Sequence, residues 1–324
     1  MERKGIGIIS PANGVLAQFP KRVKKGVEFL YKENFKVKFA TNAFKSDSYY
    51  SSEVQNRIQD INQLLEDNEI NIIMASIGGY NSNQLLPYLN YKLIKEKEKI
   101  ICGYSDITCI LLAIYSKTNI IVYHGPIYMV EMCEYPKPLD YTLEYFYKAI
   151  NKQKIKYECP SYQVKEYIDW KLQEKNSVER KKEINNNKWK ILKKGESKNK
   201  IIGGNLSSIL TILGSEYLPI SIFDEKILFI EDTEISIAEF DSFMQGMKLQ
   251  GVFKRITGLI IGKFEKEENN KLIKNFLEKF LKEYNIPVIY NIDLGHTNPK
   301  ITIPIGATAY LKCTDDIVFE ITDY

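Results

Sequence analysis

The sequence predicts an α/β protein with a parallel sheet in its first half and a second, smaller α/β domain that contains antiparallel strands. Three observations lead to this prediction. In the first half, short and almost continuously apolar runs alternate with amphipathic segments, as in parallel sheets covered by helices on both faces. A stretch dense in Lys, Asn and Glu interrupts this pattern near residues 170–200. The final runs, residues 301–313 and 316–324, look like antiparallel strands.

The first half contains five predicted strands. Nearly all their residues are apolar, so each is expected to be buried on both faces. Short loops that carry glycine and serine follow several of them, and ligands of parallel sheets collect at these carboxyl ends. The predicted strands are residues 5–10, 35–40, 71–76, 99–102 and 119–124.

Helices are predicted between these strands from apolar residues at helical spacing. One begins near Pro20, a residue suited to a first helical turn, and places Val23, Val27, Leu30 and Tyr31 on one face. The next has Val54, Ile58, Ile61 and Leu65 in line, and Ser52 with Gln55 matches a capping box before it. Residues 106–117 are predicted to be the helix that follows the fourth strand.

The second half resumes after the polar stretch. Residues 201–214 are predicted to be a strand, a glycine turn and a helix. Strands are expected at 226–232 and 258–264 and helices at 237–248 and 272–284, and an apolar run at 286–290 follows the last helix. We therefore expect one domain over residues 1–165 and another over 166–324. The stretch near 170–200 has two interpretations: a mobile connection, or a lid whose tryptophans touch a substrate.

Composition excludes several classes of protein. The 324 residues are 44% hydrophobic, and Lys+Arg 45 against Asp+Glu 41 gives a charge of only +4, so no nucleic-acid partner is expected. The 5 cysteines form no CxxC pair, and with 2 histidines they predict no disulfide framework or metal centre. The longest apolar run is too short for a membrane span, and the N-terminus lacks a signal-peptide core. A cytoplasmic location is expected.

Ser105 lies in GYSDIT, residues 103–108, between a predicted strand and a predicted helix. A serine at such a corner has two interpretations. It caps the helix, or it is a nucleophile that a tight turn raises above the sheet, where the next helix offers backbone N–H groups. The match to the elbow GxSxG is partial because the second glycine is missing.

A serine nucleophile requires a base, and a histidine requires a partner that orients it. His124 ends a strand, and His296 lies in a loop after an apolar run, so either is a candidate base. Glu231 ends the apolar strand KILFI and is a candidate acid, although a carboxylate at a strand end is common. The order Ser105, Glu231, His296 occurs in one group of catalytic triads.

Six motifs in order resemble the LD-carboxypeptidase family of serine peptidases, in particular its microcin-immunity branch. The resemblance covers nearly the whole chain. It implies a first domain similar to class I amidotransferases, a smaller second domain, an active site between them and a homodimer. The motifs are GGYNSNQLL, GYSDIT, HGP, IIGGNLS, LFIEDTE and LGHTNPKITIPIG.

The resemblance also implies the roles of individual residues. Ser105 is the nucleophile, Glu231 the orienting acid and His296 the general base. The backbone N–H groups of Gly79 and Asp106 form the oxyanion hole, and Gly78 contacts the substrate. No metal or organic cofactor takes part.

Two substrates are implied: an L,D-linked muropeptide, or an aminoacyl-nucleotide of the microcin C type. The motif GGYNSN and the stretch before IIGGN favour the nucleotide, with Trp189 stacking on the base and Asn205 contacting the amino acid. However, Ile235 stands where the branch often has lysine, so specificity for an aspartyl substrate is open. A binding protein that senses either ligand without hydrolysis is the alternative function.

Overall fold

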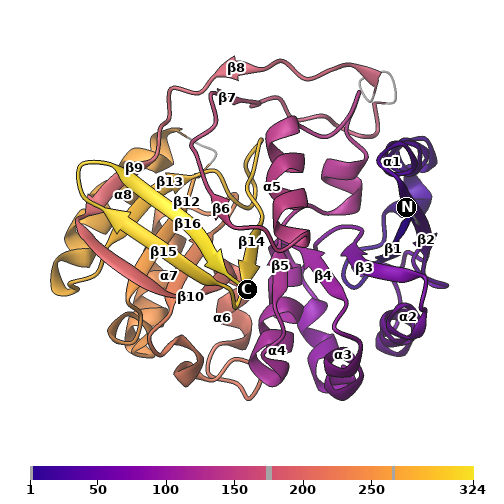
Figure 1. Cartoon of the computed structure of the whole chain (residues 1–324), viewed down its shortest axis with the longest axis horizontal. Coiled ribbons are helices and arrows are strands. Elements are labelled where there is room, and N and C mark those ends of the chain that lie inside the picture. Colours follow the sequence, from indigo (N-terminus) through magenta and orange to yellow (C-terminus); the bar gives the residue numbers. More distant parts are fainter. Residues whose placement is uncertain (1–2, 173–176, 265–266) are drawn as a thin grey trace.

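The computed structural model describes residues 3–172, 177–264 and 267–324. Its two sheets lie side by side, and helices pack around each of them (Figure 1). The first sheet is built mainly from the first half of the chain and is largely parallel. The second sheet is mixed, and its antiparallel strands include the C-terminal ones. The predicted α/β class, with a parallel sheet followed by an α/β part with antiparallel strands, is confirmed.

Six strands of the described chain form the first sheet, in the order β14-β5-β4-β3-β1-β2. All neighbours are parallel except β14, which is antiparallel to β5. Their residues are mostly buried because helices cover both faces. The strands are β1 (Lys4–Ile9), β2 (Phe35–Phe39), β3 (Ile70–Ala75), β4 (Ile100–Gly103), β5 (Val122–His124) and β14 (Ile303–Ile305).

The helices of this half divide between the two faces of the sheet. In Figure 1, α1 (Pro20–Lys32) and α5 (Asp140–Ile150) lie above it, and α2 (Val54–Glu66), α3 (Tyr91–Lys97) and α4 (Thr108–Thr118) lie below it. Nearly every residue of α4 is buried, because α4 also contacts elements of the second sheet. The helices α3 and α5 are additional to those that the sequence predicts.

Two details of the predicted helices are wrong. The capping box at Ser52 does not form: α2 begins at Val54 after Glu53, and no side chain caps it. Ser52 lies one residue too early, since the N-cap directly precedes the helix. Tyr31 is 57% exposed and packs under the Arg3 guanidinium, so it is not on the buried face of α1.

The second sheet contains eight of the described strands, in the order β6-β16-β15-β10-β11-β12-β13-β9. The strands from β10 to β13 are parallel, and the remaining neighbours are antiparallel. Its helices are α6 (Leu206–Ile212), α7 (Ile237–Leu249) and α8 (Glu267–Phe280). The strands are β6 (Ile155–Lys156), β9 (Lys190–Lys193), β10 (Gly195–Asn205), β11 (Ile227–Glu231), β12 (Gly258–Gly262), β13 (Val288–Ile292), β15 (Thr308–Cys313) and β16 (Ile317–Asp323).

The two halves of the chain exchange strands. The late strand β14 joins the first sheet, where Ile303 pairs with His124 of β5. The early strand β6 joins the second sheet beside β16. Each half therefore completes the sheet of the other, and the segment that follows β13 enters the first sheet directly. The boundary at residues 165 and 166 stays a prediction.

The polar stretch near 170–200 contains strands that its composition hides. Besides β9 and the first half of β10, the chain forms a small hairpin-like pair of β7 (Tyr162–Gln163) and β8 (Glu183–Ile184). The first half of β10 pairs antiparallel with β15 and leaves most of its side chains partly or fully exposed. An exposed strand carries polar residues, so hydrophobicity alone does not reveal it. Residues 173–176, within the predicted mobile loop, lie outside the described residues.

Gly203 and Gly204 were expected in a turn, but both lie inside β10, so that expectation is wrong. Each has a φ of +153°, which side-chain-bearing residues rarely adopt. A Cβ on Gly203 would lie 1.8 Å from the Phe229 carbonyl oxygen of the paired strand. Gly203 therefore permits β10 and β11 to approach each other, and Gly204 leaves room for the Thr108 side chain of α4.

None of the described helices combines the length and apolarity needed to cross a membrane. The five cysteines are all free thiols, and four of them are buried: Cys102, Cys109, Cys133 and Cys313.

We expect Gly203→Ala to lower the free energy of unfolding by about 2 kcal/mol or more, because its Cβ overlaps backbone atoms of β11. Urea denaturation followed by circular dichroism measures the change. Gly246→Ala is the matched control. Gly246 lies inside α7, where the nearest atom to an added Cβ is 3.7 Å away, so alanine there should stabilise by about 0.5–1 kcal/mol. Equal stability of wild type and Gly203→Ala would contradict this account of β10.

Candidate active site

Ser105 occupies the sharp turn between β4 and α4. Tyr104 before it is extended, with φ −149° and ψ −170°, whereas Ser105 itself has a φ of +62°. A positive φ is uncommon for residues other than glycine and is costly, so it persists where the surroundings impose it. Ser105 is itself the first residue of the helical turn Ser105–Ile107, and Ile107 is the residue directly before α4, so Ser105 is the N-cap of neither. Of the two interpretations of this serine, the structure therefore supports the raised turn rather than the helix cap.

The loop after β3 brings Gly78 against this serine. A Cβ on Gly78 would lie 3.0 Å from the Ser105 Oγ and 3.6 Å from the Asp106 nitrogen, so only glycine leaves room there. The Gly78 carbonyl accepts a 3.2 Å hydrogen bond from the Asn13 backbone N–H. In a trans peptide the carbonyl and the following N–H point in opposite directions, so the Gly79 N–H points away from Asn13.

The side chain of Asp106 fastens this glycine loop to the serine turn. Its Oδ2 accepts from the backbone N–H groups of Asn81 and Ser82 at 3.0 and 2.9 Å, and the Ser82 hydroxyl donates back to the Asp106 carbonyl at 2.5 Å. The buried Arg57 guanidinium donates to the Asn81 side chain at 2.7 Å. Burial raises the pKa of Asp106, against the opposing effect of these hydrogen bonds and of Arg57. The sequence predicts only the backbone role of Asp106, and this carboxylate contact is new.

Glu231 and His296 meet at the carboxyl ends of the second sheet's parallel strands. Glu231 is the last residue of β11, and its Oε2 lies 2.7 Å from the His296 Nδ1 and 3.3 Å from the His296 backbone nitrogen. Gly295 makes this approach possible, because a Cβ there would lie 2.0 Å from Oε2. Its φ of +70° is also one that glycine adopts freely. The tertiary fold thus joins the predicted acid and base, which are 65 residues apart.

The pKa values of Glu231 and His296 are shifted in opposite directions. Burial alone would raise the pKa of Glu231, but the charge of His296 and the hydrogen bond from the His296 ring lower it below the ordinary range. Burial alone would lower the pKa of His296, but Glu231 raises it above 6.5. The carboxylate therefore stabilises the protonated imidazole, as the third member of a catalytic triad does.

The two histidines differ in access to solvent. The His124 side chain is 1% exposed, whereas that of His296 is 19% exposed. The His124 Nε2 lies 3.6 Å from Oε1 of Glu231, on the oxygen opposite His296. Of the two candidate bases, only His296 combines contact to the acid with access to an incoming molecule.

Tyr104 lies between Ser105 and His296: it precedes Ser105 in the chain and its ring contacts the His296 ring. The Tyr104 and His296 rings pack edge-to-face with centroids 5.0 Å apart, and Ser105 follows Tyr104 directly. Within the described chain, no hydrogen bond joins the Ser105 hydroxyl to the His296 ring. Catalytic hydrogen bonds are often long in unliganded enzymes and shorten in the substrate complex.

Glu131, from the first half of the chain, and Lys300, from the loop before β14, form a buried pair beside the Tyr104 ring. Lys300, 2% exposed, pairs with Glu131 at 2.5 Å, and its Nζ lies 4.0 Å above the Tyr104 ring. The Tyr104 hydroxyl also donates to Glu131, at 3.3 Å. Sequence reasoning misses this buried pair because Lys300 lies in a loop motif and Glu131 in an unassigned segment. A lysine directly before the apolar run ITIPI is the available signal.

Asn205 and Trp189, the predicted substrate contacts, both have partners within the protein. Asn205 caps α6 through the Ser208 N–H at 3.0 Å and donates to Asp232 at 3.1 Å. The Trp189 indole N–H donates to Asp293 at 2.8 Å, three residues before His296. The opposite oxygen of Asp293 pairs with Lys263 at 2.5 Å. Both side chains are thereby held near the ends of the strands that carry the acid and the base.

Two other features bear on ligands. Ile235, where a lysine was expected, is 9% exposed and part of the apolar core. In the described parts of the chain, no three His, Cys, Asp or Glu side chains are grouped so as to hold a metal ion.

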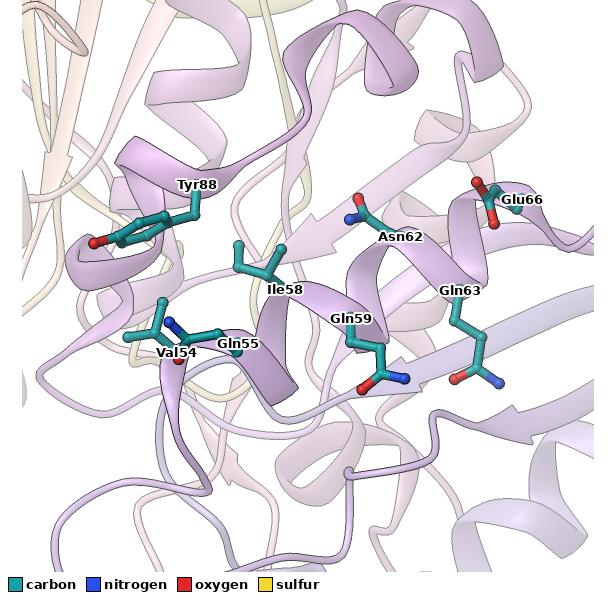
Figure 2. Close-up of a pocket in the computed structure, with 8 residues that line it drawn as sticks. All are labelled: Val54, Gln55, Ile58, Gln59, Asn62, Gln63, Glu66 and Tyr88. Carbon is teal, nitrogen blue, oxygen red and sulfur yellow. The ribbon is translucent and has the colours of Figure 1, made fainter.

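A groove of about 650 Å³ runs along α2 and is closed on one side by Tyr88 (Figure 2). Half of its lining residues are glutamine or asparagine, and Glu66 lies at the end opposite Val54. None of the candidate catalytic residues lines it. The candidate catalytic residues therefore lie at the strand ends and not in this groove.

Comparison with known families matches two parts of the chain. Residues 6–125 match the LD-carboxypeptidase N-terminal domain, and residues 198–311 match the LD-carboxypeptidase C-terminal domain. The first match includes Ser105, and the second includes Glu231 and His296.

Individual relatives are similar over almost their whole length. A putative carboxypeptidase of Vibrio cholerae is 33% identical over 98% of this chain and 95% of its own. The microcin C7 self-immunity protein MccF of Escherichia coli is 35% identical over 93% of this chain and 88% of its own.

Solved structures of MccF superpose closely on this fold. Wild-type MccF without ligand matches with a TM-score of 0.91 and 33% identity, over 100% of this chain and 97% of MccF. MccF in complex with aspartyl sulfamoyl adenosine gives the same TM-score, identity and coverage. The chain therefore belongs to the LD-carboxypeptidase family of serine peptidases.

Proposed function

We propose that this hydrolase cleaves an amide bond of a small substrate through an acyl-enzyme on Ser105, with His296 as general base and Glu231 as orienting acid. The observation that carries the proposal is the 2.7 Å contact between the buried Glu231 and the partly exposed His296, beside the strained turn of Ser105. A serine hydroxyl is a weak nucleophile until a base takes its proton, and this geometry supplies a base with a fixed tautomer.

The proposed reaction begins when His296 Nε2 takes the Ser105 proton and Oγ attacks the amide carbonyl. Because Glu231 holds Nδ1, Nε2 is the nitrogen left to accept that proton. The backbone N–H groups of Gly79 and Asp106 stabilise the negative oxygen of the tetrahedral intermediate. The protonated His296 then donates its proton to the leaving amine, and the acyl group stays on Ser105. In the second half of the reaction, His296 takes a proton from water, the water oxygen attacks the acyl carbonyl, and His296 returns the proton to the Ser105 Oγ as the acid product leaves.

The substrate is proposed from the relatives. MccF binds aspartyl sulfamoyl adenosine and glutamyl sulfamoyl guanosine, in which an amino acid is joined to a nucleoside. An aminoacyl-nucleotide is therefore the first candidate, with Trp189 at the base and Asn205 near the amino acid. An L,D-linked muropeptide is the second, because the matched family domains are those of LD-carboxypeptidases. The buried Ile235 offers no charge to an acidic aminoacyl group, which favours neutral or peptidic substrates.

The homodimer that the family resemblance implies and the cytoplasmic location expected from the composition stay predictions.

Incubation with an aspartyl sulfamoyl adenosine and, separately, with an L,D-tetrapeptide tests the function, with products followed by mass spectrometry. We expect hydrolysis of at least one at the amide bond. Ser105→Ala should abolish it in either case. Binding of a ligand by calorimetry without turnover of either would instead support a sensor on the same fold.

Ser105→Ala should eliminate labelling by a fluorophosphonate probe and lower turnover on the order of 10⁶-fold, because the nucleophile and base act as a unit. The fold should persist, since Ala removes only the hydroxyl. Ser221→Ala is the control: Ser221 is exposed in the described structure and should leave labelling unchanged. Undiminished labelling of Ser105→Ala would exclude this serine as the nucleophile.

The rate of Ser105 acylation should fall with decreasing pH, because a protonated His296 cannot accept the serine proton. Burial opposes and Glu231 favours the protonated ring, and the net effect raises the pKa of His296, so the midpoint of kcat/KM should lie above pH 6.5. Glu231→Gln removes the carboxylate charge and should lower both the midpoint and the rate, the latter by about 10³–10⁴-fold.

Glu234→Gln is the matched control for this profile. Glu234 is exposed three residues after Glu231, so its loss should leave the midpoint in place. A Glu231→Gln midpoint equal to that of wild type would show that the acid does not act on His296.

A further inference from the structure

The buried carboxylate of Glu231 faces a second imidazole. Its Oε2 binds His296, and its Oε1 lies 3.6 Å from the His124 Nε2. Glu231 and His124 are each 1% exposed. Oε1 and both His124 ring nitrogens are buried without a hydrogen-bond partner among the described residues. Buried polar atoms are almost always paired, so three unpaired atoms at one point require an explanation.

The spacing of these atoms limits how they become satisfied. Two hydrogen bonds through a water molecule need about 4.5 Å or more between the outer atoms, so no water fits in 3.6 Å. A direct hydrogen bond needs at most about 3.2 Å, so a movement of roughly half an ångström suffices to form one. The nearest partner for each of the two atoms is therefore the other.

His124 is held by strands that also carry the candidate catalytic residues, so a small movement of its ring changes its distance to Glu231. It ends β5, pairing with Gly103 just before the serine turn on one side and with Ile303 of β14 on the other. Its ring packs edge-to-face on Phe229 of β11, at 5.2 Å between centroids. The residue thus contacts the strand of the nucleophile, the strand of the acid and the segment that leaves the base loop.

We propose that His124 is a positioning residue that donates from Nε2 to Oε1 of Glu231 and so holds the carboxylate between two imidazoles. This inference deepens the proposed function and rests on it for its catalytic consequence. With both oxygens engaged, the carboxylate cannot rotate about its terminal bond, and Oε2 stays aimed at His296 Nδ1. Because the His124 N–H then stabilises part of the carboxylate charge at Oε1, Glu231 interacts less strongly with the proton of His296.

Other charged groups face this cluster and act on the same proton. Asp232 follows Glu231, and the Lys300 ammonium lies over Tyr104, whose ring packs against both histidines. Glu131 pairs with that lysine. Since His124 substitutions change none of these groups, the comparison of variants isolates the contact to Oε1.

The chain contains only 2 histidines, so its imidazole signals can be assigned without ambiguity. The experiment is a pH titration of the full chain, labelled with ¹⁵N- and ¹³C-histidine and followed by NMR, for wild type, His124→Phe and His124→Gln. In wild type, we expect a proton on His124 Nε2. In His124→Phe, the His296 midpoint should move upward by about half a pH unit, because Glu231 loses a donor and binds the His296 proton more tightly.

His124→Gln replaces the ring by an amide whose N–H can reach the same oxygen, and it should return the midpoint toward wild type. The acid limb of kcat/KM should shift in parallel, with kcat changed more than KM. An unprotonated Nε2 in wild type, or identical His296 midpoints in wild type and His124→Phe, would overturn the proposal. If circular dichroism shows that His124→Phe does not fold, two measurements still test the proposal. They are the tautomer of His124 in wild type and the His296 midpoint in His124→Gln.

The titration is independent of turnover. Failure of the proposed function would appear as unlabelled Ser105 in wild type, with the His124 proton and the midpoint shift intact. Failure of this inference would appear as labelled Ser105 in wild type, with no proton on His124 Nε2 and no midpoint shift in His124→Phe.

Discussion

A carboxylate buried at the junction of two sheets is the constraint on which this site depends. Ionised Glu231 has no access to water, and an isolated charge in such a place is strongly unfavourable unless it is paired. Its partner is the His296 ring, which reaches it only because Gly295 has no side chain and adopts a positive φ. The loop between β13 and β14 is therefore shaped by the need to satisfy one carboxylate. The same contact occupies Nδ1 of His296 and leaves its Nε2 as the other ring nitrogen.

The first sheet contributes a second constraint, which is backbone strain. Ser105 adopts a positive φ, and strain of this kind persists only where neighbours impose it. The surroundings do so through the Asp106 carboxylate, which holds the glycine loop by two backbone N–H groups, and through the close approach of Gly78. The exchange of β14 into this sheet then joins the strained turn and the buried carboxylate in one rigid arrangement. Without that exchange, the base loop would be attached to only one of the two halves.

Much of the fold could be predicted, and the exceptions have physical causes. Buried parallel strands are apolar without interruption, so β1, β3, β4 and β11 stand out from composition alone. The exposed first half of β10 is polar and therefore escapes the same reasoning. Gly203 and Gly204 resemble a turn because glycine permits two very different conformations, and only the neighbouring strand shows that close packing is the reason for them. The spacing of Ser52 and Gln55 predicts a capping box, but the helix begins one residue later than that spacing requires.

The sequence by itself determined the fold class, the family and the identity of Ser105, Glu231 and His296 as candidates, because these follow from local patterns and motifs in order. Only the tertiary structure decided which histidine faces the acid from which side, that Ser105 is strained rather than a cap, and that Asp106, Lys300 and Glu131 support the site. These facts depend on contacts between residues tens to more than a hundred positions apart along the chain. Such contacts arise from the pairing of strands and the burial of charge, and neither leaves a local pattern in the sequence.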